Sequence, residues 1–146
     1  MFTSKNPDFI STINEKLKGQ HFMHHIGFCL TRIEAGYVEG EVGLEEFLKQ
    51  QNGFLHGGAT ATLCDLVAGF AAFTLVEPTA TVVTVELKVS YLNPGVGEKV
   101  WAKGWVLKTG NLLSFCEAEV WVFNGTDRQL VAKATTTMAK VMPVLT

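Results

Sequence analysis

Long apolar runs, blocks of like charge and paired cysteines are scarce in this chain of 146 residues. The longest apolar run, residues 66–76, is too short to span a bilayer, and the first residues lack the apolar segment of a secretory signal. Lysine and arginine number 12 against 14 aspartates and glutamates, with no basic stripe. These absences predict a soluble, cytoplasmic protein that binds neither membrane nor nucleic acid.

Cysteine occurs only at Cys29, Cys64 and Cys116, each within an apolar pattern. This wide spacing predicts reduced core residues rather than a disulfide framework or a zinc site. The sequence also lacks a Gly-x-Ser-x-Gly elbow, a Walker loop, a dinucleotide-binding glycine fingerprint and a zinc-protease helix. The histidines at 21, 24 and 25 have no carboxylate or cysteine at metal-ligand spacing, so no metal site is expected.

Hydrophobic residues are plentiful, at 47% of the chain. This is more apolar surface than one small core can bury, which favours assembly of several copies. The length suits one domain, and no linker, repeat or low-complexity tract divides residues 1–146. We therefore expect one domain, with a helix and lead-in over residues 1–20.

Hydrophobic periodicity and turn residues predict an order of helix, two strands, long helix and four strands. The expected elements are a helix at 7–18, strands at 26–34 and 37–44, a helix at 57–76, and strands at 83–91, 99–108, 112–123 and 129–141. Turn residues at 110–111 and 124–127 favour an antiparallel meander of the last four strands. The order indicates an α+β fold rather than a parallel α/β fold.

Alternation within the strands predicts which faces are buried. In the strand at 83–91, the residues expected on the buried face are Val83, Val85, Leu87, Val89 and Tyr91. In the strand at 112–123, one face is small, with Ser114, Cys116, Ala118 and Val120. We expect a helix to lie against this small face, so that the sheet wraps around the helix.

The long helix begins at His56-Gly57-Gly58 without the Ser, Thr, Asp or Asn that normally caps the first amides. Free N–H groups at the positive end of a helix dipole suit an oxygen that gains negative charge, so the pattern predicts an oxyanion hole. Alternatively, the glycines only supply backbone angles that other residues cannot adopt. His56 is expected to support the turn rather than to act as a base.

Small side chains form one stripe along the long helix, and Asp65 is the only charged residue on it. The stripe contains Gly58, Ala61, Asp65, Ala68, Gly69 and Ala72, whereas Leu66, Phe70 and Phe73 point elsewhere. A carboxylate on a narrow apolar groove can serve as a base. The alternative, that Asp65 pairs with a distant Lys or Arg or reaches the surface, stays open.

The string Gly53-Phe54-Leu55-His56-Gly57-Gly58, with Asp65 in the second helical turn and the strand from Val83 to Pro94, resembles one known family. It is similar to the hotdog-fold acyl-CoA thioesterases of the phenylacetate-pathway type, within the 4-hydroxybenzoyl-CoA thioesterase superfamily. The resemblance covers residues 20–142. It implies a sheet wrapped around a central helix, a homodimer paired edge to edge or a homotetramer, and active sites at the dimer interface.

The same resemblance implies roles for individual residues. The Gly57 amide would polarise the thioester carbonyl, and Asp65 of the facing subunit would activate water or attack directly. Thr84 would orient that water, and Gln50 stands where some relatives have a substrate-binding Asn. The other expected substrate contacts are His56, Gly58, Asn52 and Phe54.

The implied reaction is hydrolysis of acyl-CoA to a free acid and CoA, which needs a positioned water, a base and an oxyanion donor but no cofactor. Two alternatives remain: an acyl-CoA hydratase or dehydratase, and a non-catalytic acyl-CoA-binding module. Phe54, Phe70, Phe73 and the N-terminal helix are the expected lining of the acyl tunnel. Aromatic, hydroxylated aromatic and medium-chain acyl groups are all compatible with such a lining.

Overall fold

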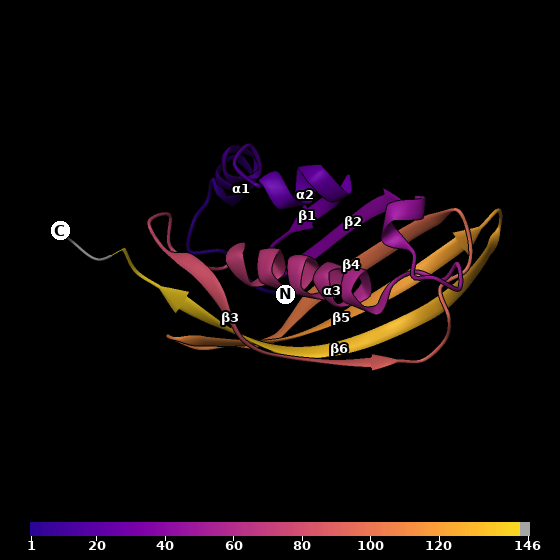
Figure 1. Ribbon diagram of the computed structural model, residues 1–146. Helices are drawn as coiled ribbons and strands as arrows, with labels where there is room; N and C mark the ends of the chain where they lie inside the picture. Colours follow the sequence, from indigo (N-terminus) through magenta and orange to yellow (C-terminus); the bar gives the residue numbers. More distant parts are fainter. Residues whose placement is uncertain (144–146) are drawn as a thin grey trace.

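The computed structural model describes residues 1–143, in which an antiparallel sheet of six strands curves around one long helix (Figure 1). The elements are α1 (Phe9–Leu17), α2 (His21–Ile26), β1 (Cys29–Glu34), β2 (Tyr37–Gly43), a short 3-10 helix (Glu46–Leu48), α3 (Gly57–Phe73), β3 (Thr81–Tyr91), β4 (Lys99–Thr109), β5 (Leu113–Asn124) and β6 (Asp127–Val141). This architecture confirms the α+β prediction and the prediction of a sheet wrapped around a helix.

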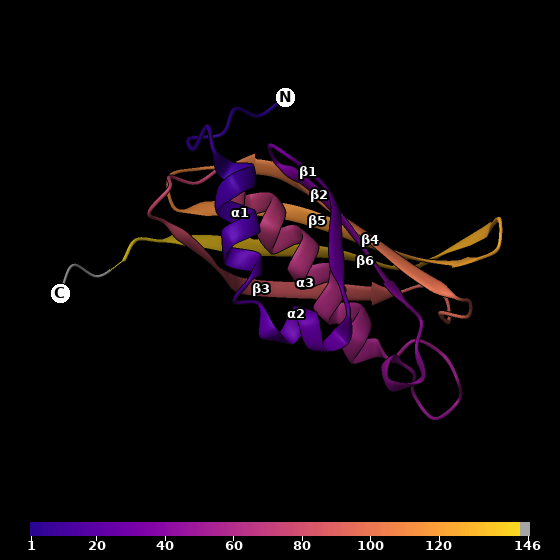
Figure 2. The same cartoon turned by 90° about the horizontal axis from the view of Figure 1, so that it is seen from above.

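The strand order is β1-β2-β4-β5-β6-β3. Strands β4, β5 and β6 form the predicted meander, but β3 pairs with β6 at the far edge, so the four-strand meander is wrong in its first strand. Figure 2 shows the reason: β1 and β2 flank one side of α3, and β3 flanks the other. The chain leaves α3 on the side that β2 has not covered, and residues 92–98 then return it to β4.

Helix α3 lies very close to β4. A Cβ atom at Gly104 would stand 2.5 Å from the carbonyl carbon of Val67. This is too close for any side chain, so only glycine fits at this position. The predicted small face of β5 is confirmed, since its members are buried toward α3: Ser114, Cys116, Ala118 and Val120. The sheet can therefore curve around the helix backbone without a layer of bulky side chains between them.

The prediction for the faces of β3 is wrong at Val83 and Val85, which are 47% and 61% exposed. Tyr91 is also largely exposed, whereas Leu87 and Val89 are half-buried as expected. The pairing of β3 with β6 is irregular between Thr84 and Glu86. A β-bulge of this kind reverses which side chains face inward, so the simple alternation fails here.

A short helix that the periodicity did not reveal, α2, precedes the first strand. It ends at Gly27, whose φ of 76° is a left-handed helix terminus, so the strand predicted from residue 26 begins only at Cys29. Cys29 is exposed, contrary to the prediction of a core residue, while Cys64 and Cys116 are buried and free. Burial raises the pKa of both buried thiols to about 12.

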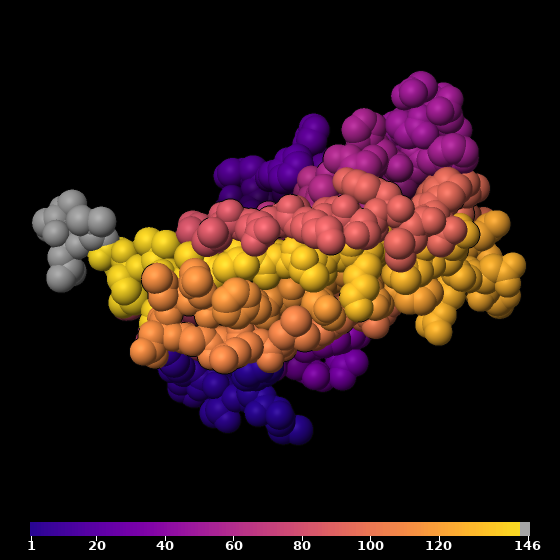
Figure 3. Space-filling view, turned by 90° about the horizontal axis from the view of Figure 1, so that it is seen from below, coloured from indigo at the N-terminus to yellow at the C-terminus, as the bar shows by residue number. Residues whose placement is uncertain are grey.

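On the outer face of the sheet, a lysine side chain lies over the rings of two tryptophans. Figure 3 looks onto this face, where β5 and β6 lie side by side and β3 runs along the edge. Lys103 Nζ lies 5.7 Å from the ring centre of Trp101 and 5.4 Å from that of Trp105.

Within residues 1–143, no helix combines the length and the apolar character needed to cross a bilayer.

Glu77, just beyond α3, joins both ends of the chain to the core. Its Oε1 accepts from Lys5 Nζ at 3.2 Å and from Lys140 Nζ at 3.1 Å. A backbone N–H bond, followed by Lys140 and Lys5, lowers the pKa of this carboxyl group to about 2. The ionised form of Glu77 is therefore the one that the fold stabilises.

Replacing Glu77 by Gln should lower the melting temperature at neutral pH. The folded pKa lies below the unfolded value of about 4.3, so this stabilisation is present above that value and is lost as the pH falls toward 2. Thermal unfolding of parent and variant should therefore differ at pH 7 and converge at acid pH. Glu15→Gln, which alters an exposed pair with Lys18, is the control; a pH-independent difference for Glu77→Gln would contradict this assignment.

Candidate functional site

A tight turn over residues 50–54 leads into α3. The Gln50 N–H donates to the Phe54 carbonyl at 2.8 Å, and the Gly53 N–H donates to the Gln50 carbonyl at 2.9 Å. The side-chain Oε1 of Gln50 accepts from the Asn52 N–H at 2.7 Å, while Gly53 has a φ of 82°. The side chain of Gln50 thus stabilises the turn through its amide oxygen, and Asn52 contributes its backbone N–H.

His56 caps α3, so the prediction of uncapped first amides is wrong for Gly58. His56 Nδ1 accepts from the Gly58 N–H at 2.9 Å, which requires the proton of the neutral ring to be on Nε2. The His56 carbonyl accepts from the Thr60 N–H at 3.0 Å and so orients the peptide that contains the Gly57 N–H. That N–H has no acceptor within residues 1–143. One free, fixed donor therefore remains at the positive end of the helix.

Tyr91, at the end of β3, fixes the next peptide unit. Its hydroxyl donates to the Gly57 carbonyl at 2.9 Å, and the N–H of the same peptide is the one capped by His56. Neither Gly57 nor Gly58 has a positive φ, so the alternative that these glycines serve only special backbone angles is wrong. The sequence pattern marked Tyr91 only as a face residue, because a contact across 34 positions leaves no local signal.

The expected substrate contacts separate into two pockets. Gln50, Phe54 and Gly57 line the first, together with Tyr91. His56 and Gly58 face another pocket, whose apolar lining includes Phe22, Ile26, Phe47, Leu48 and Leu63. Asn52 is exposed on the turn. The free Gly57 donor therefore belongs to a pocket with Gln50 and Phe54. The side chain of His56 lines the other pocket.

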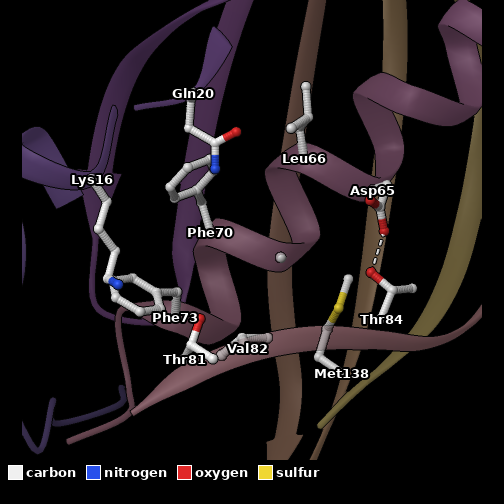
Figure 4. A pocket seen from close by; sticks show the side chains of 11 residues that line it. Lys16, Gln20, Asp65, Leu66, Phe70, Phe73, Thr81, Val82, Thr84 and Met138 are labelled. Carbon is white, nitrogen blue, oxygen red and sulfur yellow. Dashed lines mark hydrogen bonds between the residues drawn. The ribbon is translucent and has the colours of Figure 1, made fainter. Parts of the chain in front are cut away.

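Asp65 and Thr84 line a third pocket (Figure 4). Thr84 Oγ1 donates to Asp65 Oδ1 at 2.6 Å, which leaves Oδ2 without a partner among the described residues. No Lys or Arg of residues 1–143 forms an ion pair with Asp65, so the alternative of a distant cationic partner is wrong. Asp65 itself is half-buried.

The lining of the Asp65 pocket corrects the predicted stripe. Leu66, Phe70 and Phe73 share the pocket with Asp65, whereas Ala68 and Ala72 are buried. The predicted tunnel residues Phe70 and Phe73 are present, and Lys16 of α1 and Gln20 represent the N-terminal segment. Phe54, the other predicted tunnel residue, lies in the Gly57 pocket.

One chain keeps the donor and the carboxylate apart. Gly57 and Asp65 are separated by about two turns of α3, which is about 12 Å along the helix axis, and they line different pockets. Within one chain, the free N–H of Gly57 and the carboxylate of Asp65 therefore lie in separate pockets.

Comparison with known proteins relates this geometry to one family. The family model described as the thioesterase superfamily matches residues 52–128, which contain α3 and strands β3, β4 and β5. The proofreading thioesterase EntH of Klebsiella pneumoniae is 36% identical over 52% of this chain and 56% of its own length. The chain thus spans little more than half the length of that relative. Acyl-coenzyme A thioesterase 13 of Homo sapiens is 31% identical over 81% of this chain and 85% of its own length.

A solved structure shows the same architecture over nearly the whole chain. The crystal structure of a thioesterase family protein from Silicibacter pomeroyi superposes with a TM-score of 0.90 at 32% identity, covering 92% of this chain and 99% of that one. This likeness confirms the predicted hotdog fold.

Removal of the histidine cap gives a test of the α3 start. His56→Ala should lower the free energy of unfolding by about 1 kcal/mol, because the Gly58 N–H loses its acceptor. His56→Asn should recover most of this loss, since Asn is a strong cap. Urea unfolding of the three proteins measures both changes. Equal stability of the Ala and Asn variants would exclude capping as the role of His56.

Proposed function

Because the chain belongs to the thioesterase superfamily, we propose that it hydrolyses acyl-CoA thioesters to a free acid and CoA. The single observation that carries the proposal is the pair of half-sites on α3: a fixed, free N–H at Gly57 and the Asp65–Thr84 pair beside a pocket. A thioester needs one group to hold the developing oxyanion and another to activate water. These two groups supply both requirements.

The reaction proceeds by attack of water on the thioester carbonyl. Asp65 Oδ2 accepts a proton from the water as the C–O bond forms, while the Thr84 hydroxyl holds Oδ1 and orients the carboxylate. The Gly57 N–H donates to the oxyanion. Collapse of the tetrahedral intermediate breaks the C–S bond, and the leaving CoA thiolate takes up the proton. Direct attack by Asp65, followed by hydrolysis of the anhydride, is the alternative first step.

A second copy of the chain completes each site in this proposal. Strand β3 is the edge of the sheet, and Val83 and Val85 on it are exposed. Edge-to-edge pairing of two copies along β3 would cover this apolar strand and its free backbone groups. Such a homodimer, or a tetramer of two of them, would bring Gly57 of one protomer to Asp65 of its partner. A cytoplasmic location belongs to the same proposal.

Loss of the carboxylate should abolish most turnover. Asp65→Asn is expected to lower kcat by about 10²–10⁴-fold without unfolding the protein, because the amide is isosteric but cannot accept the proton. Thr84→Ala should lower kcat less, and Thr84→Ser should restore it. Release of free CoA thiol from aryl and aliphatic acyl-CoAs measures turnover, with Asp8→Asn as the surface control. Full activity of Asp65→Asn would exclude the mechanism; hydration of crotonyl-CoA in place of hydrolysis would favour the hydratase alternative.

Proline at position 57 can remove the proposed oxyanion donor selectively. Gly57 is the first helical residue, where proline is well tolerated, and His56 already has the extended angles (φ −65°, ψ 136°) that a following proline requires. Gly57→Pro should therefore fold normally and lose about 10²–10³-fold in kcat. Unchanged turnover would remove Gly57 from the mechanism.

Mixed dimers then test whether each site is shared between protomers. Co-expression of Gly57→Pro with Asp65→Asn chains should restore about a quarter of the parent activity, because half of the dimers are mixed and each has one intact site. Dimers in which both half-sites came from one chain would show no recovery.

A further inference from the structure

The pocket beside Asp65 has a second end that the proposed reaction does not use. In Figure 4, Asp65 and Thr84 stand at one end, and Lys16 and Phe73 stand at the other. Asp65 and Phe73 are about two turns of α3 apart, which is about 12 Å. The volume of the pocket, about 170 Å³, is close to that of the roughly 150 Å³ cavity that accommodates benzene. An acyl group of moderate length can therefore reach from Asp65 to Lys16.

The middle of this pocket is apolar and the far end is not. Leu66, Gly69, Phe70 and Met138 line the space between the two ends. The side chain of Gln20 also lines this pocket (Figure 4), and its amide has no hydrogen-bond partner within residues 1–143. A purely hydrocarbon acyl chain would leave this amide unsatisfied when it displaced water.

Lys16 gives the far end a positive charge without a counter-ion. Its Nζ lies 5.2 Å from the centre of the Phe73 ring, and no carboxylate in the described part of the chain forms an ion pair with it. Lys18, two residues further along the chain, differs, because it pairs with Glu15 at 2.5 Å and lies outside this pocket. The two lysines therefore form a matched pair, one neutralised and one free.

We propose that the pocket selects acyl groups that carry a carboxylate at the end remote from the thioester, with Lys16 and Gln20 as its specificity-determining contacts. This inference rests on the proposed thioester hydrolysis. Asp65 repels a carboxylate placed next to the thioester, whereas Lys16 attracts one at the far end of the pocket. Lys16 Nζ lies over the ring of Phe73, which is about 12 Å from Asp65 along α3. The substrate class is thus the CoA monothioesters of medium-length dicarboxylic acids, such as adipoyl-CoA, rather than malonyl-CoA.

The test compares two acyl-CoAs of equal chain length, adipoyl-CoA and hexanoyl-CoA, by release of CoA thiol. The ratio of their kcat/KM values should exceed one in the parent protein and fall about tenfold in Lys16→Met, the loss of one charge-assisted contact. Lys16→Arg should keep most of the parent ratio. Lys18→Met, the matched control, should leave the ratio at the parent value.

Each other outcome has a distinct meaning. A parent ratio below one, or a ratio that Lys16→Met does not change, overturns the proposal. An equal fall for both substrates in Lys16→Met also overturns it, because Lys16 would then meet a group that all acyl-CoAs share, such as a CoA phosphate. If the parent protein hydrolyses neither substrate nor any other acyl-CoA, the proposed function fails first, which is distinguishable from turnover without Lys16-dependent selection.

Discussion

The close approach of α3 to the sheet is the constraint on which the rest of the structure depends. The missing side chain of Gly104 and the small inward face of β5 let the helix backbone lie against β4. Since the helix itself fills the interior, the pockets lie beside α3, against β3 in two cases and against α2 and Val42 of β2 in the third. A bulkier inner face would lift the helix and separate Asp65 from Thr84, whose contact spans 2.6 Å.

The start of α3 shows how hydrogen bonds to neighbouring peptide groups can fix an unpaired backbone donor that they do not contact. His56 and Tyr91 secure the peptide between Gly57 and Gly58, and the Thr60 N–H secures the one before it. All neighbouring dipoles are therefore fixed, and the remaining N–H points outward from a rigid frame. Preorganisation of this kind avoids the cost of reorienting dipoles when charge develops. The histidine of the motif serves the backbone, and this role explains its place directly before the glycines.

Patterns within one helix or strand could be predicted from the sequence, whereas contacts between residues far apart in the sequence could not. The small face of β5 follows from spacing alone, because it depends on one strand and its period. Spacing placed Gly57, Gly58 and Asp65 on one helix, but their roles in a reaction stay predictions. The position of β3 beside β6, the short helix α2 and the cap by His56 were missed. Only the pairing of β3 with β6 joins residues far apart in the sequence. Helix α2 has six residues, too few for a clear helical period, and histidine lies outside the usual set of capping residues.

The bulge in β3 decides whether Thr84 and Tyr91 face the same side of the sheet. Thr84 and Tyr91 are an odd number of positions apart, so in a regular strand one of them would face the helix and the other the solvent. The irregular pairing between Thr84 and Glu86 adds the residue that brings both hydroxyls to the same side, one to Asp65 and the other to the Gly57 carbonyl. A single strand thereby contacts both Asp65 and the start of α3. The number of residues in this segment, more than their types, therefore directs both hydroxyls toward α3.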